Sequence, residues 1–519
     1  MTTTSFVFSC DRELVKSLLS KLLSEKLDAL LDSAEADASS RDLEIGAWKM
    51  ANAIGSASLA ELFVLQARRV TEKDIEARGL DPSKVRLRLD RDYSYCMTTT
   101  FGQVVFPLSA YRNLAGGSPV VRNPAAEKFK LHRRCRSSEL CLEFETRVGS
   151  NHPFRTAQED LRYFTHGAVT TEDTTIATHT TKVGLSLHWS WTYRTVENIR
   201  ETLRTVATRD ATTGRPIICV SSDAHALRRY ADSTYNAQWK MANGVRIWCE
   251  NRDTGEIVHL GGEYTWGDCN EVEAILRRLI DSGHLPSDGN YGGGVVAHVA
   301  WITDGAPWLE ERIQKLFPTS RMILDVYHVI ERVATVATAA WGKGHPQAHR
   351  FNRIAYEAIF GAPRLPKEKP KARRGHKKQP RAETMARRRR LERRRHRNQT
   401  TGARLILDFL ANANVPKSCI GVLMNTLRYI SNNAHRMDYA RYIQEGYQVG
   451  SGAMESLHRV GSQIRLKRSG SGWLPETAQA IFNLRMMALV DRWDEFWSQP
   501  DLTDKLVMAF DGESSPIAA

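Results

Sequence analysis

The sequence predicts an α/β fold, because uncharged apolar stretches of strand length alternate with amphipathic helical segments. In the stretch 295–303, eight of nine residues are apolar, Thr or aromatic and none is charged. This pattern is typical of a strand buried on both faces of a sheet. Stretches 216–222 and 321–326 are further predicted strands, and residues 309–317 and 329–341 show helical spacing. We therefore expect a sheet covered by helices on both faces.

Three parts precede this predicted core. Leucines at helical spacing indicate a helical unit over 1–80, for core packing or self-association. Short alternating runs on either side of a predicted turn at 101–103 indicate a small β-rich subdomain over 81–150. Two short helical patterns joined by a glycine turn predict a helix-turn-helix-like DNA-binding region over 151–212, although an ordinary αα-hairpin has the same outline. Its first helix is expected to bury Ala157, Leu161 and Phe164.

The core itself is predicted to be discontinuous in the sequence. It occupies 213–344, with a strand pair at 244–250 and 256–263, and the chain returns to it at 448–497. The intervening 345–447 is predicted to be a helical insertion that carries a basic segment, and 498–519 form a tail.

The positive charge of the chain is concentrated in that basic segment. Residues 364–397 hold 17 Lys and Arg against three acidic residues, which equals the net charge of +14 of the whole chain. A polyanion is the natural partner of such a segment; the alternative is a solvated spacer without a specific target. The densest phosphate-contacting candidates are Arg387, Arg388, Arg389, Arg390, Arg393, Arg394 and Arg395.

Composition also bears on the cellular compartment. The eight cysteines show no paired framework, which favours a reducing cytoplasm. No window approaches the roughly 20 apolar residues of a membrane span, and the first residues do not resemble a secretory signal. We expect a cytoplasmic protein with no membrane partner.

Three acidic residues occupy positions that suit catalysis. Asp223 and Asp304 each follow a predicted buried strand, where open α/β sheets place their ligand crevice. Glu455 lies in the first turn of a predicted helix over 453–468, which Ser451 can cap. The alternatives are that Asp304 caps the helix that follows it and that Glu455 forms a surface pair with Arg459.

Three carboxylates at one end of a sheet predict a site for hard, oxygen-seeking cations. Mg²⁺ fits such ligands, with Mn²⁺ as an alternative, whereas zinc does not. Two ions about 3.5–4 Å apart would activate one oxygen and stabilise another during in-line attack on a phosphodiester.

Several segments resemble DDE transposases of bacterial insertion sequences, closest to the ISKra group. These are Ile-Thr-Asp-Gly-Ala-Pro-Trp at 302–308, Leu-Asp-Val-Tyr-His at 324–328 and Gly-Ser-Gly-Ala-Met-Glu at 450–455, with further likeness at 144–184 and 465–473. The resemblance covers about residues 140–497. It implies a ribonuclease-H-like catalytic core with a helical insertion before the final Glu. The paired Cys-x-x-Cys elements that such proteins often carry upstream are absent from this sequence.

The resemblance also implies a function. The chain would bind the ends of its own element and the target DNA, as a homo-oligomer associated with the nucleoid. It would cleave and transfer DNA strands with Asp223, Asp304 and Glu455 as catalytic residues and metal ligands; Asp232 competes with Asp223 for the first role. Two other functions remain open: a structure-directed nuclease of the same fold, and a non-cutting regulator derived from a transposase.

Other residues are predicted to support the site or to contact DNA. Asp325 and His328 could assist the metal ligands, but Asp325 is equally suited to cap the next helix and His328 to fill the core. Trp473 could stack on an unpaired base or be buried. The remaining predicted DNA contacts near Glu455 are Arg459, Arg465, Lys467 and Arg468.

Overall fold

Five strands form one mixed sheet in the order β6-β5-β4-β7-β8. β4 (Ile217–Tyr230), β5 (Ala237–Glu250) and β6 (Ile257–Thr265) are antiparallel neighbours. β7 (His298–Thr303) and β8 (Arg321–Leu324) extend the sheet parallel to β4. The α/β class predicted from the sequence is confirmed, including the pair β5 and β6.

The computed structural model describes residues 12–36, 38–80, 85–113, 121–122, 124–128, 135–230, 237–360 and 402–511. These residues form two compact units. One comprises residues 1–188 with 494–517, and the other residues 189–493, within the described ranges. The basic segment 364–397 with its predicted DNA contacts, and Asp232, lie outside the described residues.

One face of the sheet packs against a helix that precedes β4 and two helices that connect later strands. α7 (Val196–Thr205), α8 (Cys269–Asp281) and α9 (Pro307–Leu316) supply apolar residues to this side. The shared cluster includes Leu203, Ile218, Val220, Ile247, Val272, Leu276, Trp301 and Ile313. Since Ile218 and Val220 alternate with residues of the opposite face, β4 is buried on both sides through this stretch.

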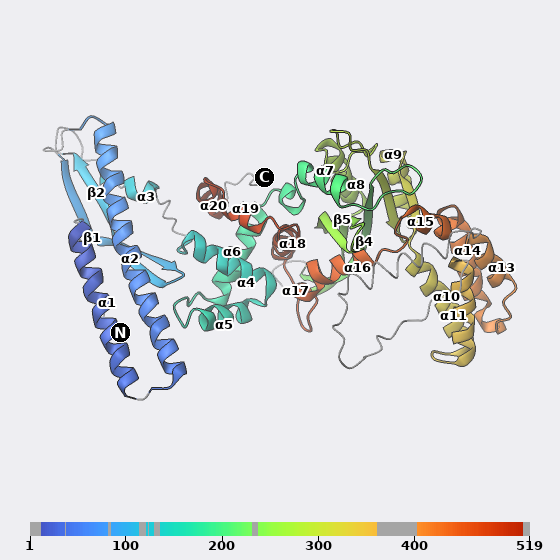
Figure 1. Cartoon of the computed structure of the whole chain (residues 1–519), viewed down its shortest axis with the longest axis horizontal. Helices are drawn as coiled ribbons and strands as arrows, with labels where there is room; N and C mark the ends of the chain where they lie inside the picture. Colours follow the sequence, from blue (N-terminus) through green and yellow to red (C-terminus); the bar gives the residue numbers. More distant parts are fainter. Residues whose placement is uncertain are drawn as a thin grey trace. The chain divides into compact units, whose positions relative to one another are not determined.

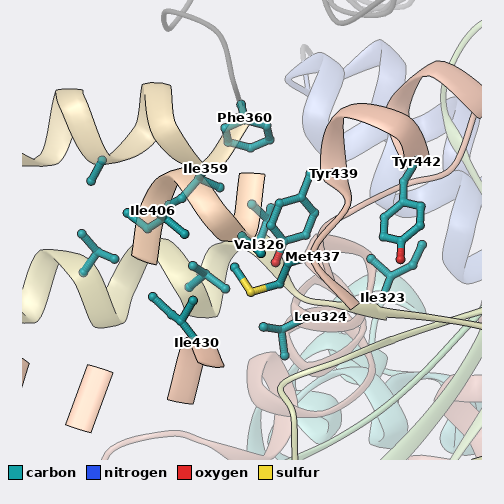
Figure 2. Packing of buried hydrophobic residues seen from close by; sticks show 14 of the residues in the cluster. Ile323, Leu324, Val326, Ile359, Phe360, Ile406, Ile430, Met437, Tyr439 and Tyr442 are labelled. Carbon is teal, nitrogen blue, oxygen red and sulfur yellow. The ribbon is translucent and has the colours of Figure 1, made fainter. Parts of the chain in front are cut away.

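The other face packs against the helices that follow β8. These are α10 (Val326–Trp341), α11 (Pro346–Phe360), α13 (Gly402–Ala411), α14 (Ile420–Asn433) and α15 (Tyr439–Glu445). α10, α11, α13 and α14 lie beside one another (Figure 1). In Figure 2, Ile323 and Leu324 of β8 lie in the same packed cluster as Ile359, Ile406 and Ile430. The insertion predicted at 345–447 therefore completes the core instead of standing apart from it.

The chain after this insertion returns to the sheet as short helical pieces. α16 (Gly452–Leu457) is followed by a π-helical turn (His458–Gln463), α17 (Ile464–Leu466) and α18 (Pro475–Leu489). Short 3₁₀ turns occur at Trp189–Thr192, Lys417–Cys419 and Ala434–Arg436. The helix predicted over 453–468 is confirmed as the continuous helical segment 452–466, but a π-helical turn replaces its middle part.

The unit that contains the N-terminal residues begins with two long helices and a small antiparallel sheet. α1 (Arg12–Glu35) lies beside α2 (Ser40–Ala77), which packs on the sheet of order β1-β2-β3. The strands are Val85–Thr99, Gly102–Asn113 and Val121–Arg122, followed by α3 (Pro124–Lys128). The predicted helices and hairpin are confirmed. The alternative that the α1 leucines simply pack in a core is not confirmed. Four of them are exposed: Leu14, Leu23, Leu27 and Leu31.

The same unit contains α4 (Glu139–Asn151), α5 (Phe154–Phe164), α6 (Asp173–Ser186) and α20 (Leu502–Asp511); α19 spans Trp493–Trp497. α5 and α6 are the two helices predicted for the helix-turn-helix-like region. α5 buries Ala157 and Leu161 as expected, but Phe164 is 69% exposed, so its predicted burial is wrong. None of the helices in the described ranges is long and apolar enough to cross a membrane.

Candidate active site

Three acidic residues lie at one level on adjacent strands. The register pairs Val220 of β4 with Trp301 of β7, and three residues further along both strands are Asp223 and Asp304. Ser221 supports this register beyond the paired residues, since its Oγ donates to the carbonyl oxygen of Ile302 at 2.7 Å. β7 and β8 pair Thr303 with Leu324, so that Asp304 and Asp325 follow in step. The edge of the sheet thus carries a row of carboxylates across three strands.

Asp223 and Asp304 also belong to the same face of the sheet. Alternation along β4 groups Asp223 with Cys219, and alternation along β7 groups Asp304 with Ala300. Cys219 and Ala300 belong to the cluster on the α10 side, which also includes Ala453 of α16. The helix that carries Glu455 therefore packs on the face that presents both aspartates.

The sequence predicts Asp223 directly after a strand, but the structure places it inside β4. β4 continues for seven residues beyond Asp223 because β5 pairs with it as far as Tyr230. Only the parallel neighbour β7 stops near the level of Asp223. On the β7 side of β4, the ladder therefore ends near the level of the carboxylate, and backbone pairing resumes only with Trp473, at Arg228 to Tyr230.

A glycine opposite Asp223 admits the helix that carries Glu455. Asp223 pairs with Gly244 of β5. A Cβ on Gly244 would lie 2.6 Å from Cε of Met454 and 2.8 Å from Cε1 of Tyr264. Any larger residue at this position would displace α16 or Tyr264.

The Asp223 carboxylate accepts a hydrogen bond from a histidine that the sequence analysis missed. Nε2 of His458 lies 3.3 Å from Oδ2 of Asp223, and Nδ1 of His458 lies 3.1 Å from the Tyr264 hydroxyl. Nε2 of His458 donates to Asp223, and Nδ1 shares a hydrogen bond with the Tyr264 hydroxyl. Burial raises the pKa of Asp223, but the hydrogen bond and charge of His458 outweigh it, so that the pKa is lowered. Asp223 is accordingly ionised at neutral pH.

The π-helical turn sets the direction of the side chains in this segment. It presents His458 to Asp223 and Ser462 to His225, whose Nε2 lies 2.7 Å from the Ser462 Oγ. The extra residue in a π turn changes which positions face inward. Ile464, which a regular helix would place on the same side as Leu457, is 46% exposed, whereas Ser462 and Arg465 are fully buried. The sequence signal available for His458 was its spacing of three from Glu455, which places the two on one side of a helix.

Asp304 lies in a tight turn between β7 and α9. Its Oδ1 accepts a hydrogen bond from the Ala306 backbone N at 3.1 Å, and its carbonyl oxygen accepts one from the Tyr429 hydroxyl at 2.7 Å. Gly305 has φ +91°, a conformation that favours glycine. α9 begins at Pro307 with Ala306 as its N-cap and no side-chain cap bond. Asp304 therefore forms the turn before the helix without capping it.

Asp325 is fully buried, and both of its carboxylate oxygens accept hydrogen bonds. It caps α10 through the Tyr327 backbone N at 2.9 Å and accepts a bond from Nδ1 of His328 at 2.7 Å. It also accepts bonds from the backbone N of Ser451 at 3.2 Å and the Ser451 Oγ at 2.5 Å. Ser451 thus bonds to Asp325 and does not cap α16 with its side chain, contrary to the expectation. Asp325 fixes the start of the Glu455 helix to the end of β8.

His328 carries positive charge beside this row of acids. The hydrogen bond from its ring to Asp325 raises the pKa of His328 to about 9 against the effect of burial, and the charges of Asp325, Asp304 and Asp223 add to the shift. It is half-buried rather than enclosed in the core. The charge of His328 offsets part of the repulsion among these carboxylates.

Glu455 lies on the exposed side of α16, in its first turn. The predicted surface pair with Arg459 is not formed, as the ion pairs of the described chain do not include one between them. In the described part of the chain, no three His, Cys, Asp or Glu side chains are already grouped around a metal position. The strand register aligns Asp223 with Asp304, and Glu455 is exposed on α16, which packs against β4 and β5.

The predicted DNA contacts near Glu455 fall into two groups. Arg459, Lys467 and Arg468 are exposed. Arg465 is fully buried with its guanidinium 4.6 Å above the Trp473 ring, and burial lowers the pKa of Arg465 to about 9. Nε1 of Trp473 donates to the Leu466 carbonyl oxygen at 2.8 Å. Arg465 and Trp473 thus pack on each other, with Arg465 buried and Trp473 half-buried.

Comparison of the sequence with protein-family models and with curated proteins finds no match to this chain.

Proposed function

We propose that this chain is a DDE-type transposase, which cleaves DNA at the ends of its element and joins the freed strand to target DNA. The observation that carries the proposal is the common level of Asp223 and Asp304 on adjacent parallel strands, with the Glu455 helix packed on the same face. This is the arrangement that the resemblance in segments 302–308 and 450–455 implies.

The strand order supports a ribonuclease-H-like core as part of the proposal. Three antiparallel strands are followed by two that run parallel to the first, and the long first strand β4 lies in the middle. The two aspartates then lie on β4 and directly after its parallel neighbour β7. The Glu comes from a helix reached only after the helices that follow β8.

The donor chemistry of this edge fits magnesium. Asp223, Asp304 and Glu455 offer carboxylate oxygens, the ligands that Mg²⁺ prefers, and no thiolate is among them. These three residues would hold two Mg²⁺ ions, with Mn²⁺ as a substitute. When bound, the ions supply activation of the attacking oxygen and stabilisation of the leaving oxygen.

The residues of the chain prepare this edge for such chemistry. His458 keeps Asp223 ionised and oriented, and Tyr264 fixes the His458 ring. Asp325 holds the start of α16, which positions Glu455. In the proposed reaction a water oxygen forms a bond to phosphorus while the 3′-oxygen leaves. The freed 3′-hydroxyl then attacks a target phosphodiester, forming a bond to its phosphorus while the 3′-oxygen of the target strand leaves.

DNA binding is assigned in the proposal to the helix-turn-helix-like helices α5 and α6, to the exposed cations Arg459, Lys467 and Arg468, and to the basic segment 364–397. Each Lys or Arg that neutralises a phosphate releases counterions, so we expect binding to weaken steeply with salt. Two element ends must be brought together for joining, which requires a homo-oligomer on DNA.

The test is Mg²⁺-dependent cleavage and joining of DNA that carries the sequences flanking the coding region. We expect activity in the wild type and none in Asp304→Asn, with DNA binding retained. Asp253→Asn, which changes an exposed aspartate in the turn before β6, is the matched control and should keep full activity. Strand transfer that survives in Asp304→Asn would rule out the assignment, and cleavage without joining would indicate a nuclease instead.

A further inference from the structure

β4 and β5 continue as a two-stranded ribbon beyond the rest of the sheet. The pairing of β4 with β7 ends at Val220, and that of β5 with β6 ends at Asn243. Residues 224–230 of β4 still pair with 237–243 of β5. The ribbon starts one residue after Asp223, at the edge that holds the proposed active site.

The two faces of this ribbon differ in burial. On the face shared with Asp223, His225, Leu227 and Ala242 are buried. On the opposite face, Trp239 is 60% exposed and Met241 is 51% exposed. α7, α8 and α9 cover the apolar residues of this face further back in the sheet but do not reach the ribbon. A large aromatic and a large flexible side chain therefore face solvent side by side.

Basic residues accompany the exposed aromatic ring. Arg228 is the cross-strand partner of Trp239, which brings their side chains to within about 5.5 Å at Cβ. Lys240, the next residue of β5, is also exposed, but its side chain lies on the other face of the ribbon. Within the described ranges, no ion pair joins Arg228 or Lys240 to an acidic residue. The ribbon therefore combines an open stacking surface with positive charge that protein carboxylates do not neutralise.

The ribbon begins next to Asp223, but Trp239 lies on the face opposite to the carboxylate, so a strand that leaves the proposed active site would pass round the edge of the ribbon to reach the ring. Arg228 follows Asp223 by five residues on one strand, a distance of roughly 17 Å at the rise of a β-strand. Unpaired bases stack on exposed aromatic rings irrespective of sequence, and nearby cations bind the phosphates. A second protein copy would favour an apolar patch without this unpaired charge.

We infer that the face of the ribbon formed by Arg228, Trp239 and Met241 binds an unpaired segment of the DNA strand next to the cleavage position. Trp239 stacks on a base, while Arg228, its cross-strand partner on the same face, contacts a phosphate. The inference rests on the proposed function, since it names a binding site beside the proposed active site.

The experiment measures DNA binding without cleavage. The full chain is titrated, in EDTA, against a fluorescein-labelled mixed-sequence single strand of about 20 nucleotides and against the matching duplex, by anisotropy. Trp239→Ala should weaken single-strand binding about tenfold and duplex binding much less, and Trp239→Phe should restore most of the loss. Arg228→Gln should reduce the salt dependence of single-strand binding. Trp48→Ala removes a tryptophan of similar exposure, 50%, in the other unit and should bind single strands as the wild type does.

The outcomes that overturn the inference are distinct from failure of the proposed function. Unchanged single-strand binding by Trp239→Ala, or equal weakening for single strand and duplex, would refute the site. A wild-type dimer that Trp239→Ala converts to a monomer, with DNA binding unaltered, would assign the face to a second copy. Because binding is measured in EDTA, loss of single-strand affinity in Trp239→Ala supports the inference even if no cleavage is observed. Equal melting temperatures of wild type and variants verify the fold.

Discussion

Nε2 of His458 lies 3.3 Å from Oδ2 of Asp223, although the two residues are 235 positions apart. The contact joins the middle of β4 to the π-helical turn that directly follows α16. Glu455 lies three residues before His458, on the same side of the helical segment. The contact therefore also fixes the rotation of α16 about its own axis, and with it the direction of Glu455. Alignment of the proposed acidic residues thus depends on one histidine as well as on the sheet.

Replacing this histidine should change the acid limb of the proposed activity. In His458→Gln the charge that lowers the Asp223 pKa is lost while its burial remains, so that pKa rises. The pH profile of Mg²⁺-dependent cleavage should then lose activity at a higher pH than in the wild type. His435→Gln removes an exposed histidine that pairs with Glu310 and should leave the profile unchanged. An unaltered acid limb in His458→Gln would contradict the positioning role.

Asp325 should matter for stability in the absence of metal. Asp325→Ala removes a buried carboxylate that accepts bonds from Tyr327, His328 and Ser451. We expect a loss of about 3 kcal/mol in the free energy of unfolding, since these donors stay buried without an acceptor. Urea unfolding in EDTA measures it, and Asp304→Asn, at a half-exposed turn, should lose far less. A similar small loss in both variants would argue against the bonded role of Asp325.

Gly244 should be intolerant of a side chain. In Gly244→Ala the added Cβ meets Met454 and the Tyr264 ring, so we expect destabilisation of about 1–3 kcal/mol, as for other overpacked cores. Gly421 of α14 has no atom within 4 Å of a built Cβ, and Gly421→Ala should be neutral or stabilising because alanine favours helix. Thermal unfolding of both variants checks the pair. Equal stability of Gly244→Ala and wild type would show that α16 does not pack as closely as described.

His179 should make the free energy of unfolding of the protein decrease as the pH rises above neutral. Burial lowers its pKa, but the bonds to Cys135 and to the buried Glu145, whose Oε2 lies 2.6 Å from Nδ1 of His179, outweigh burial and raise the pKa to about 9. A folded pKa above the unfolded value near 6.5 gives stability that is fully present below pH 6.5 and is lost as pH rises through 9. The difference in unfolding free energy between wild type and His179→Gln should shrink over this range. His152→Gln changes an exposed histidine of the same unit. The difference in unfolding free energy between this variant and the wild type should stay constant over the same pH range.

The sequence was sufficient for the elements whose patterns are local. β7, α8 and α10 follow from apolar runs and helical periodicity, and the Pro307 start of α9 follows from the preference of proline for a first helical turn. The acidic residues after the strands were visible for the same reason. Their common level depends on strand register, which the resemblance implies but local patterns do not contain.

The errors arise where tertiary pairing decides the structure. β4 continues past Asp223 because β5 supplies a partner, not because residues 224–230 form a stronger strand pattern. The π-helical turn adds a residue to a turn whose sequence reads as regular helix, which moved Ile464 outward and Arg465 inward. His458 was passed over because its partners Asp223 and Tyr264 are about two hundred residues away.

The bonds between Asp325 and Ser451 close the chain across a sequence separation of 126. Phe360, where α11 ends, and Gly402, where α13 begins, both fall within that closed loop of the chain. Insertions or deletions between these two residues therefore need not shift the third acid relative to the other two. A length change there is tolerated as long as the base of the loop stays bonded, so that this part of the protein can diverge among related chains while the chemistry at the sheet edge is kept.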